Sequence, residues 1–129
     1  MNGERYLLDT NAVIQLFGGN RAVEQVLNMS DSVAMSVVTE FEFLSYPALT
    51  DADRRHYQAF RAYLHVYDVP SDDEIFTQMI VSARQRNGLK LPDVIIAATA
   101  RKNDLTLLTA DDHFKKLRYP WKVRFYKPI

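Results

Sequence analysis

Short apolar runs alternate along this chain with longer stretches in which apolar residues recur every three or four positions. The short runs suit buried strands and fall at residues 6–8, 32–38, 66–69, 106–109 and 123–126. The longer stretches have helical periodicity and fall at residues 11–17, 21–29, 39–44, 50–65, 74–87 and 91–100. Strands that alternate with helices are typical of a parallel sheet covered on both faces. The pattern predicts an α/β fold, a three-layer α/β/α sandwich with a mainly parallel central sheet, built as one domain over residues 1–129.

Helix-capping residues support these boundaries. Thr50 and Asp53 have the spacing of a helix start, and Ser71 with Glu74 reads as a capping box for the next helix. Gly88 is placed to end that helix, and Pro92 lies in the first turn of the following one. This last helix is apolar nearly all round over residues 94–100, so we expect it to be central and packed on both sides.

Composition excludes several kinds of site. The chain has no cysteine, which rules out disulfides, thiolate metal sites and cysteine nucleophiles. No apolar run approaches the roughly 20 residues of a membrane span, and the first apolar run begins too early to leave room for a signal peptide. We therefore expect a cytoplasmic protein with no membrane partner. The 16 basic and 16 acidic residues balance, so any nucleic-acid contact must come from local positive charge.

The segment Arg5–Asn11 contains the first candidate for chemistry. Its apolar residues end abruptly at Asp9, which precedes the first predicted helix. Polar groups at the carboxyl ends of parallel strands face the crevice where α/β proteins bind ligands. Asp9 taken alone is better explained as a helix cap.

Further acids occupy equivalent positions. They are Glu40 or Glu42 after the second strand, Asp93 at the start of the buried helix, and Asp111 or Asp112 after the fourth strand. Each one alone is readily explained as a cap or surface residue. Together, however, they would meet at one edge of the sheet, where clustered carboxylates repel unless a cation intervenes. Oxygen ligands of this kind suit Mg²⁺ or Mn²⁺, and such a site suits metal-assisted attack on a phosphodiester.

Four segments, in order, resemble the PIN-domain nucleases, and among them the toxin ribonucleases of the VapC type. The opening strand with Asp9-Thr10-Asn11 is similar to the family's D-T-N segment. Residues 36–44 are similar to S-x-x-T-x-x-E-L, residues 93–100 resemble D-x-x-I-A-A-T-A, and residues 107–114 look like L-x-T-x-D-x-x-F. The resemblance covers essentially the whole chain and implies a PIN-like fold.

The resemblance also implies which residues form the site. Catalytic and metal-binding acids are expected at Asp9, Glu42, Asp93 and Asp111, with Asn11 and Thr109 as polar supports. Glu42 lies three residues after Thr39 as the family pattern requires, and residues two apart on a helix point in opposite directions. Glu40 is then expected to be solvated or to support the site from behind.

Substrate and partners follow from the same resemblance. It implies hydrolysis of RNA with Mg²⁺ (or Mn²⁺), a homodimer, and a small antitoxin protein that holds the enzyme inactive. Phosphate contacts are suggested at Arg84, Arg86 and Lys90, although charged helix surfaces are at least as often merely solvated. Lys102 and the pair Arg54 and Arg55 are further candidates. The aromatic segments 41–46 and 57–67 are suited either to a partner interface or to the core.

Two other functions remain open from the sequence. One is a PIN-type nuclease of RNA maturation or decay that has no antitoxin. The other is an α/β phosphoacceptor or phosphatase-like domain that uses Asp9. A phosphatase of the haloacid-dehalogenase type is expected to have a second Asp two residues later, where this chain has Asn11.

Overall fold

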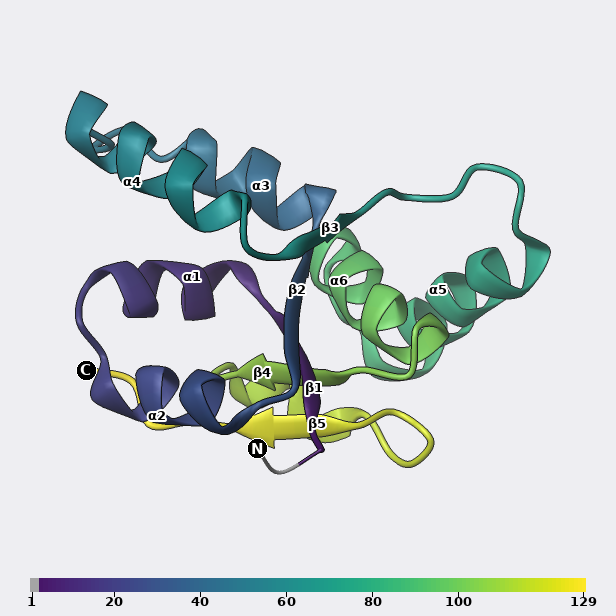
Figure 1. Cartoon of the computed structure of the whole chain (residues 1–129). Helices are drawn as coiled ribbons and strands as arrows, with labels where there is room; N and C mark the ends of the chain where they lie inside the picture. The colour runs from purple at the N-terminus through teal and green to yellow at the C-terminus, as the bar shows by residue number, and fades with distance from the viewer. Residues whose placement is uncertain (1–2) are drawn as a thin grey trace.

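A computed structural model describes residues 3–129 of the chain and shows a five-stranded parallel sheet. The strand order is β3-β2-β1-β4-β5, and each neighbouring pair is parallel (Figure 1). The strands are β1 (Arg5–Leu8), β2 (Ser32–Ser36), β3 (His65–Tyr67), β4 (Thr106–Thr109) and β5 (Val123–Phe125). The helices are α1 (Thr10–Phe17), α2 (Arg21–Met29), α3 (Val37–Leu44), α4 (Asp51–Arg61), α5 (Glu74–Asn87), α6 (Leu91–Lys102) and the short 3-10 helix η1 (Asp112–Lys116). The predicted α/β sandwich is confirmed.

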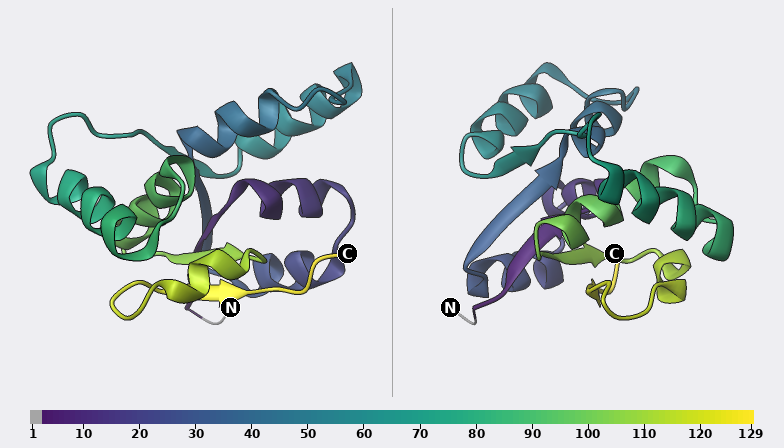
Figure 2. Two further views of the ribbon diagram at one scale, coloured as in Figure 1. Left: turned by 180° about the vertical axis from the view of Figure 1, so that it is seen from behind. Right: turned by 90° about the vertical axis from the view of Figure 1, so that its right-hand side faces the viewer.

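Side chains that alternate along the strands form two cores, one on each face of the sheet. Leu7 of β1 and Leu107 of β4 pack with α5, α6 and η1. Leu8 and Leu108, one residue further on, pack on the opposite face with α1, α2 and α3. Figure 2 shows these helices on the two sides of the sheet. Because β1 and β4 are buried on both faces, they read as continuous apolar runs in the sequence.

Helix α6 is as central as its composition predicts. Six of its residues are buried: Val94, Ile96, Ala97, Ala98, Thr99 and Ala100. Its predecessor α5 ends at Gly88, which adopts the left-handed conformation (φ 64°) that favours glycine. The two helices are antiparallel neighbours, so the start of α6 lies beside the end of α5.

Several predicted boundaries are wrong by a few residues. The second strand ends at Ser36 rather than residue 38, because the Ser36 side chain caps α3 by accepting a hydrogen bond from the Val38 amide. The predicted capping box at Ser71 is also wrong, since Asp73 caps α5 by accepting from the Phe76 amide. The capping box of Thr50 and Asp53 is present at the start of α4.

Helices α3 and α4 form a hairpin that extends beyond the sheet (Figures 1 and 2). Phe43 and Tyr57 stack inside it with ring centroids 4.9 Å apart and are buried. Phe41 and Tyr63 are instead 61% and 92% exposed. The aromatic segments are therefore divided between the core and the surface, as both alternatives from the sequence allow.

None of the helices within residues 3–129 is long and apolar enough to cross a membrane. Met1 and Asn2, which the predicted single domain includes, lie outside the described residues. The extent of that domain stays a prediction.

Candidate active site

Four segments bring the predicted acids and Thr109 to the carboxyl edge of the sheet. Asp9 directly follows β1, and Thr109 ends the adjacent strand β4, with Asp111 two residues later. Asp93 lies in the first turn of α6 and Glu42 in the last turn of α3. The chain continues from β1 to β2 on one side, while β4 lies on the other side. Such a reversal of strand order is where open α/β sheets bind ligands.

Asp9 is the most buried of the acids and uses both carboxylate oxygens. Its Oδ1 caps α1 by accepting a hydrogen bond from the Ala12 amide at 2.7 Å, and its Oδ2 accepts one from the Thr109 hydroxyl. Burial raises the pKa of Asp9 to about 6, although these two hydrogen bonds oppose the shift. Repulsion from Asp111 and Asp93 raises the pKa further. Asp9 is thus both a helix cap and a buried acid beside other acids.

Asp93 is linked electrostatically to the other predicted acids. Its pKa is raised, first by burial and then by repulsion from Asp111 and Glu42, while Lys90 and His113 act in the opposite direction. Four acids that are far apart in the sequence therefore lie close enough to affect one another's ionisation. In the described part of the chain, no lysine or arginine forms an ion pair with any of these four carboxylates.

The two glutamates of α3 point to different surroundings. The Thr10 hydroxyl donates to Oε1 of Glu42 at 2.5 Å and lies 3.5 Å from the Thr39 hydroxyl, which connects α3 to the start of α1. Glu40 instead pairs with Arg61 and accepts a hydrogen bond from the Tyr57 hydroxyl at 2.9 Å. The Arg61 guanidinium holds the pKa of Glu40 below its usual range. The carboxylate of Glu40 thus contacts residues of α4, whereas the charge of Glu42 acts on Asp93.

The predicted polar supports differ in their placement. Thr109 is fully buried and contacts two acids, because its hydroxyl donates to Asp9 and accepts from the Asp111 amide at 3.0 Å. Asn11 is exposed, and its side chain makes no hydrogen bond within residues 3–129. The structure therefore gives a supporting contact to Thr109 but none to Asn11.

Asp111 and the adjacent Asp112 have different hydrogen-bond and ion-pair partners. Asp111 caps η1, and its Oδ1 accepts from the His113 amide at 2.9 Å and lies 2.8 Å from His113 Nδ1. Asp112 is exposed and pairs with Lys115 at 3.0 Å. His113 is a surface residue that contacts one of the acids.

The predicted phosphate contacts do not form one patch. Lys90 lies at the start of α6, where its charge acts on Asp93. Arg84 and Arg86 are two residues apart on α5 and line different pockets. Lys102 is at the far end of α6 from Asp93 and pairs with Asp73 at 2.7 Å. Lys102 is thus already paired with an acid, and its contact with phosphate stays a prediction.

Two residues near the acids were not predicted. Thr10 is the hydrogen-bond donor to Glu42. Tyr126 follows β5, and its buried hydroxyl has no hydrogen-bond partner among residues 3–129. Burial raises the pKa of this hydroxyl, and the charge of Asp9 raises it further, so the phenol lies near that carboxylate. No sequence motif marks Tyr126, because its position depends on how β5 pairs with β4.

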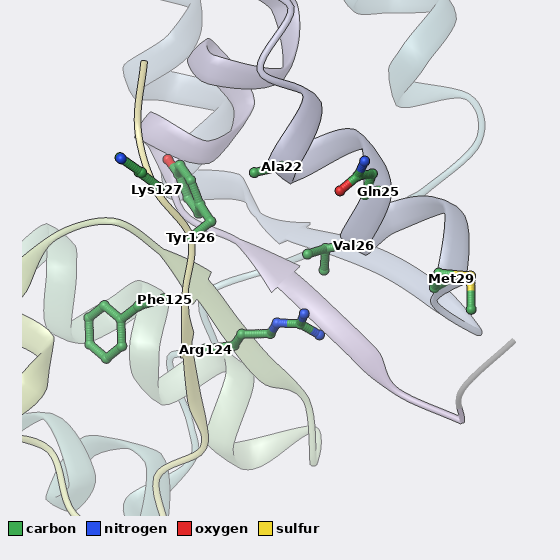
Figure 3. Close-up of a pocket in the computed structure, with 8 residues that line it drawn as sticks. All are labelled: Ala22, Gln25, Val26, Met29, Arg124, Phe125, Tyr126 and Lys127. Atoms are coloured by element: carbon green, nitrogen blue, oxygen red, sulfur yellow. The ribbon is translucent and has the colours of Figure 1, made fainter.

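Tyr126 also lines a pocket between α2 and β5, shown in Figure 3. Tyr126 lies beside Lys127 at one end of the pocket, whereas Arg124 points toward β1 and donates to the Tyr6 hydroxyl at 2.6 Å. None of the four predicted acids lines this pocket. Tyr126 is thus the one lining residue that this pocket shares with the surroundings of Asp9 within the described chain.

The acids suit a divalent cation by their chemistry. They offer only oxygen donors, and the buried Asp9 is already oriented by Thr109 and Ala12, as ligands of metal sites commonly are. Within residues 3–129, however, no three carboxylate or imidazole groups are close enough together to hold one ion as they stand. Side-chain rotation at the more exposed acids would be needed, so one ion shared by all four stays a prediction.

Comparison with known proteins gives one consistent result. The family model described as PIN domain matches residues 6–119. Ribonuclease VapC51 of Mycobacterium tuberculosis is 30% identical over 115 residues, which cover 85% of this chain and 82% of that protein. A toxin-antitoxin complex from Klebsiella pneumoniae contains a chain that is 30% identical, with a TM-score of 0.74 over 91% of this chain and 98% of that one.

A more distant solved structure agrees in fold. VapBC2 from Rickettsia felis, bound to a DNA fragment from its promoter, has a TM-score of 0.77 at 18% identity. The match covers 95% of this chain and 99% of that one.

Proposed function

This chain belongs to the PIN-domain family, and from that membership we propose that it is a metal-dependent endoribonuclease that hydrolyses RNA phosphodiesters. One observation of the structure carries the proposal. Asp9, Glu42, Asp93 and Asp111 converge on the carboxyl edge of the sheet, and no lysine or arginine of residues 3–129 pairs with them. Clustered carboxylates without a lysine or arginine partner are unfavourable for folding alone and so point to a cation and a phosphate as their ligands.

We assign the ion as Mg²⁺ or Mn²⁺, because the donors are all oxygen. When bound to these acids, such an ion activates water and neutralises charge on the phosphate. Asp9 and Asp93 are the principal ligands in this proposal, since both are shielded from bulk water and repel each other. Glu42 and Asp111 complete the set.

The other residues of the site orient these acids. Thr109 fixes one oxygen of Asp9 and the backbone of Asp111, and so holds the ends of β1 and β4 in register. Thr10 holds Glu42 against the start of α1. Lys90 lies close enough to Asp93 to lower its pKa, and it is placed to meet an incoming phosphate beside that acid.

We further propose that the enzyme is the toxin of a toxin-antitoxin pair, acts on cytoplasmic RNA and forms a homodimer. The similarity to the Klebsiella pneumoniae toxin-antitoxin complex supports the first point. The exposed Phe41 and Tyr63 on the α3–α4 hairpin supply apolar surface for a protein partner. The phosphatase-like alternative has no comparable support, since the matched family is the PIN domain.

Cleavage of RNA by the purified chain tests this function. Total cellular RNA is incubated with the wild-type protein in EDTA, Mg²⁺ or Mn²⁺, and with the Asp93→Asn variant. We expect cleavage only with metal, and at least about 100-fold less cleavage by the variant, as for loss of a group that acts in the transition state. The exposed Asp72 provides a matched control, since Asp72→Asn removes an acid far from the site. Undiminished cleavage by Asp93→Asn would remove this acid from the mechanism.

A further inference from the structure

A basic pocket lies between α5, α6 and the segment that follows η1. It has a volume of about 330 Å³ and includes four cationic side chains, Arg86, Arg101, Lys116 and Arg118, and no acidic one. Figures 1 and 2 show the segment after η1 running beside α5. Because the whole chain has a net charge of zero, four cations without an acid are a marked local excess of positive charge.

The four pocket cations differ from other basic residues on the surface. Elsewhere on the surface Arg61, Lys102, Lys115 and Lys122 each pair with a carboxylate. Within residues 3–129, none of the four pocket cations does so. Like charges held close together repel, so an anionic ligand would stabilise this arrangement.

Two aromatic side chains line the same pocket. The Arg101 guanidinium lies 4.8 Å from the centre of the Trp121 ring, a cation–π contact that orients this arginine. Tyr119 is 89% exposed, so its ring faces are open to a ligand. An exposed aromatic ring among unpaired cations is the arrangement with which proteins bind single-stranded nucleic acid, by stacking on a base and contacting the phosphates.

One end of the pocket, at Lys116 and Asn87, lies on the side of the acids. Lys116 ends η1, which begins directly after Asp111, and its Nζ donates to the Asn87 carbonyl at 3.2 Å. At a rise of about 2 Å per residue, a 3-10 helix of this length spans about 10 Å. Lys116 at one end of the pocket therefore lies about 10 Å from Asp111. Arg101, at the end of α6, and Tyr119, before β5, lie further away, so an RNA strand cut at the acids would reach them only with a nucleotide several positions from the cut.

We propose that this pocket binds a nucleotide of single-stranded RNA several positions away from the scissile phosphate. Its base stacks on Tyr119, and its phosphates contact Arg86, Lys116 and Arg118. The inference rests on the proposed ribonuclease function and adds a specific site for the substrate to it. It favours unpaired RNA, because bases within a duplex are stacked on each other and cannot stack on Tyr119.

Fluorescence anisotropy tests the pocket directly. A fluorescein-labelled single-stranded RNA oligonucleotide of mixed sequence is titrated with the full chain in EDTA, at several salt concentrations. We expect Tyr119→Ala to weaken binding on the order of tenfold, and Tyr119→Phe to bind as the wild type does, because the ring and not the hydroxyl stacks. Arg118→Gln should weaken binding and reduce the salt dependence of log Kd by about 0.7, the effect of one phosphate contact. Arg21→Gln, an exposed arginine on α2 outside the pocket, is the matched control and should change neither.

The outcomes separate this inference from the proposed function. If the wild type cleaves RNA but Tyr119→Ala and Arg118→Gln bind as it does, the pocket is not an RNA site and the ribonuclease proposal stands. The stacking site is refuted if a blunt DNA duplex displaces the labelled RNA as well as unlabelled single-stranded RNA does, while Tyr119→Ala binds RNA as tightly as the wild type. If the wild type neither binds nor cleaves RNA in any metal, the proposed function itself fails. Because Tyr119 and Arg118 are both exposed, circular dichroism should show each variant to be folded.

Discussion

At the scale of single residues, Asp9 shows why a capping role and a site role are compatible. One of its oxygens satisfies the first turn of α1, while the other accepts from Thr109 near the acids of two other segments. A carboxylate shielded from water beside like charges destabilises the folded chain when it is ionised. This destabilisation corresponds to a pKa of Asp9 that is raised from 3.8 to about 6.

This cost predicts a pH-dependent stability difference between the metal-free wild type and Asp9→Asn. Above pH 6 the wild-type carboxyl is ionised in both the folded and unfolded states, so its burial costs about 3 kcal/mol. Because the folded-state pKa is the higher one, the wild type regains that stability as the pH falls from 6 to 3.8. Asparagine caps helices about as well as aspartate, so the variant lacks the ionisation cost but keeps the cap.

Urea denaturation in EDTA at a series of pH values measures this difference. We expect Asp9→Asn to be the more stable protein at pH 7 and the difference to vanish near pH 4. Asp68→Asn, which removes an exposed acid outside the helices, should show no such dependence in this range. A constant difference across the range would show that the buried carboxyl is not the cause.

Thr109→Val provides a second prediction at this scale. The change is nearly isosteric but removes the hydroxyl that donates to Asp9 and accepts from the Asp111 amide. Since that donation lowers the pKa of Asp9, its loss should raise the pKa above about 6. Loss of a group that orients metal ligands typically costs about 10–100-fold in metal affinity or activity. The pH profile of RNA cleavage should accordingly shift to higher pH, and Thr109→Ser should restore it.

At the scale of elements, α3 separates two glutamates with different roles. Residues two apart on a helix point about 200° apart, and Glu42 contacts Thr10 whereas Glu40 contacts Tyr57 and Arg61. The sequence could place both acids on one helix. It could not show which of the two glutamates contacts α4, because Arg61 and Glu40 meet only when the hairpin has folded.

Matched substitutions in α3 should therefore have opposite effects. Glu42→Gln should reduce RNA cleavage strongly and leave the unfolding midpoint nearly unchanged, since Glu42 is exposed. Glu40→Gln should retain cleavage but lower the free energy of unfolding by about 1 kcal/mol, through the weakened contacts to Arg61 and Tyr57. Cleavage rates and urea melts of both variants provide the measurement. An exchange of the two effects would assign the site to Glu40.

At the scale of the whole molecule, the fold was predictable because it depends on local patterns, whereas the choice of Glu42 and Asp111 over the neighbouring acids came from the family resemblance. Apolar runs mark the strands, and each run that ends near an acid marks one edge of the sheet. Contacts between distant segments were not predictable from such patterns. Thr109 and Asp9 are 100 residues apart, and Tyr126 reaches the surroundings of Asp9 only through the pairing of β5 with β4. The basic pocket likewise needs α5, α6 and the segment after η1 to be packed together.

Binding of Mn²⁺, measured by isothermal titration calorimetry, tests the central claim most directly. That claim is that acids from distant segments hold one divalent-cation site at the carboxyl edge of the sheet. The account predicts that the wild type and Glu40→Gln bind Mn²⁺ alike, whereas Asp9→Asn and Asp93→Asn each bind it at least about tenfold more weakly. Equal Mn²⁺ affinity in all four proteins would contradict it.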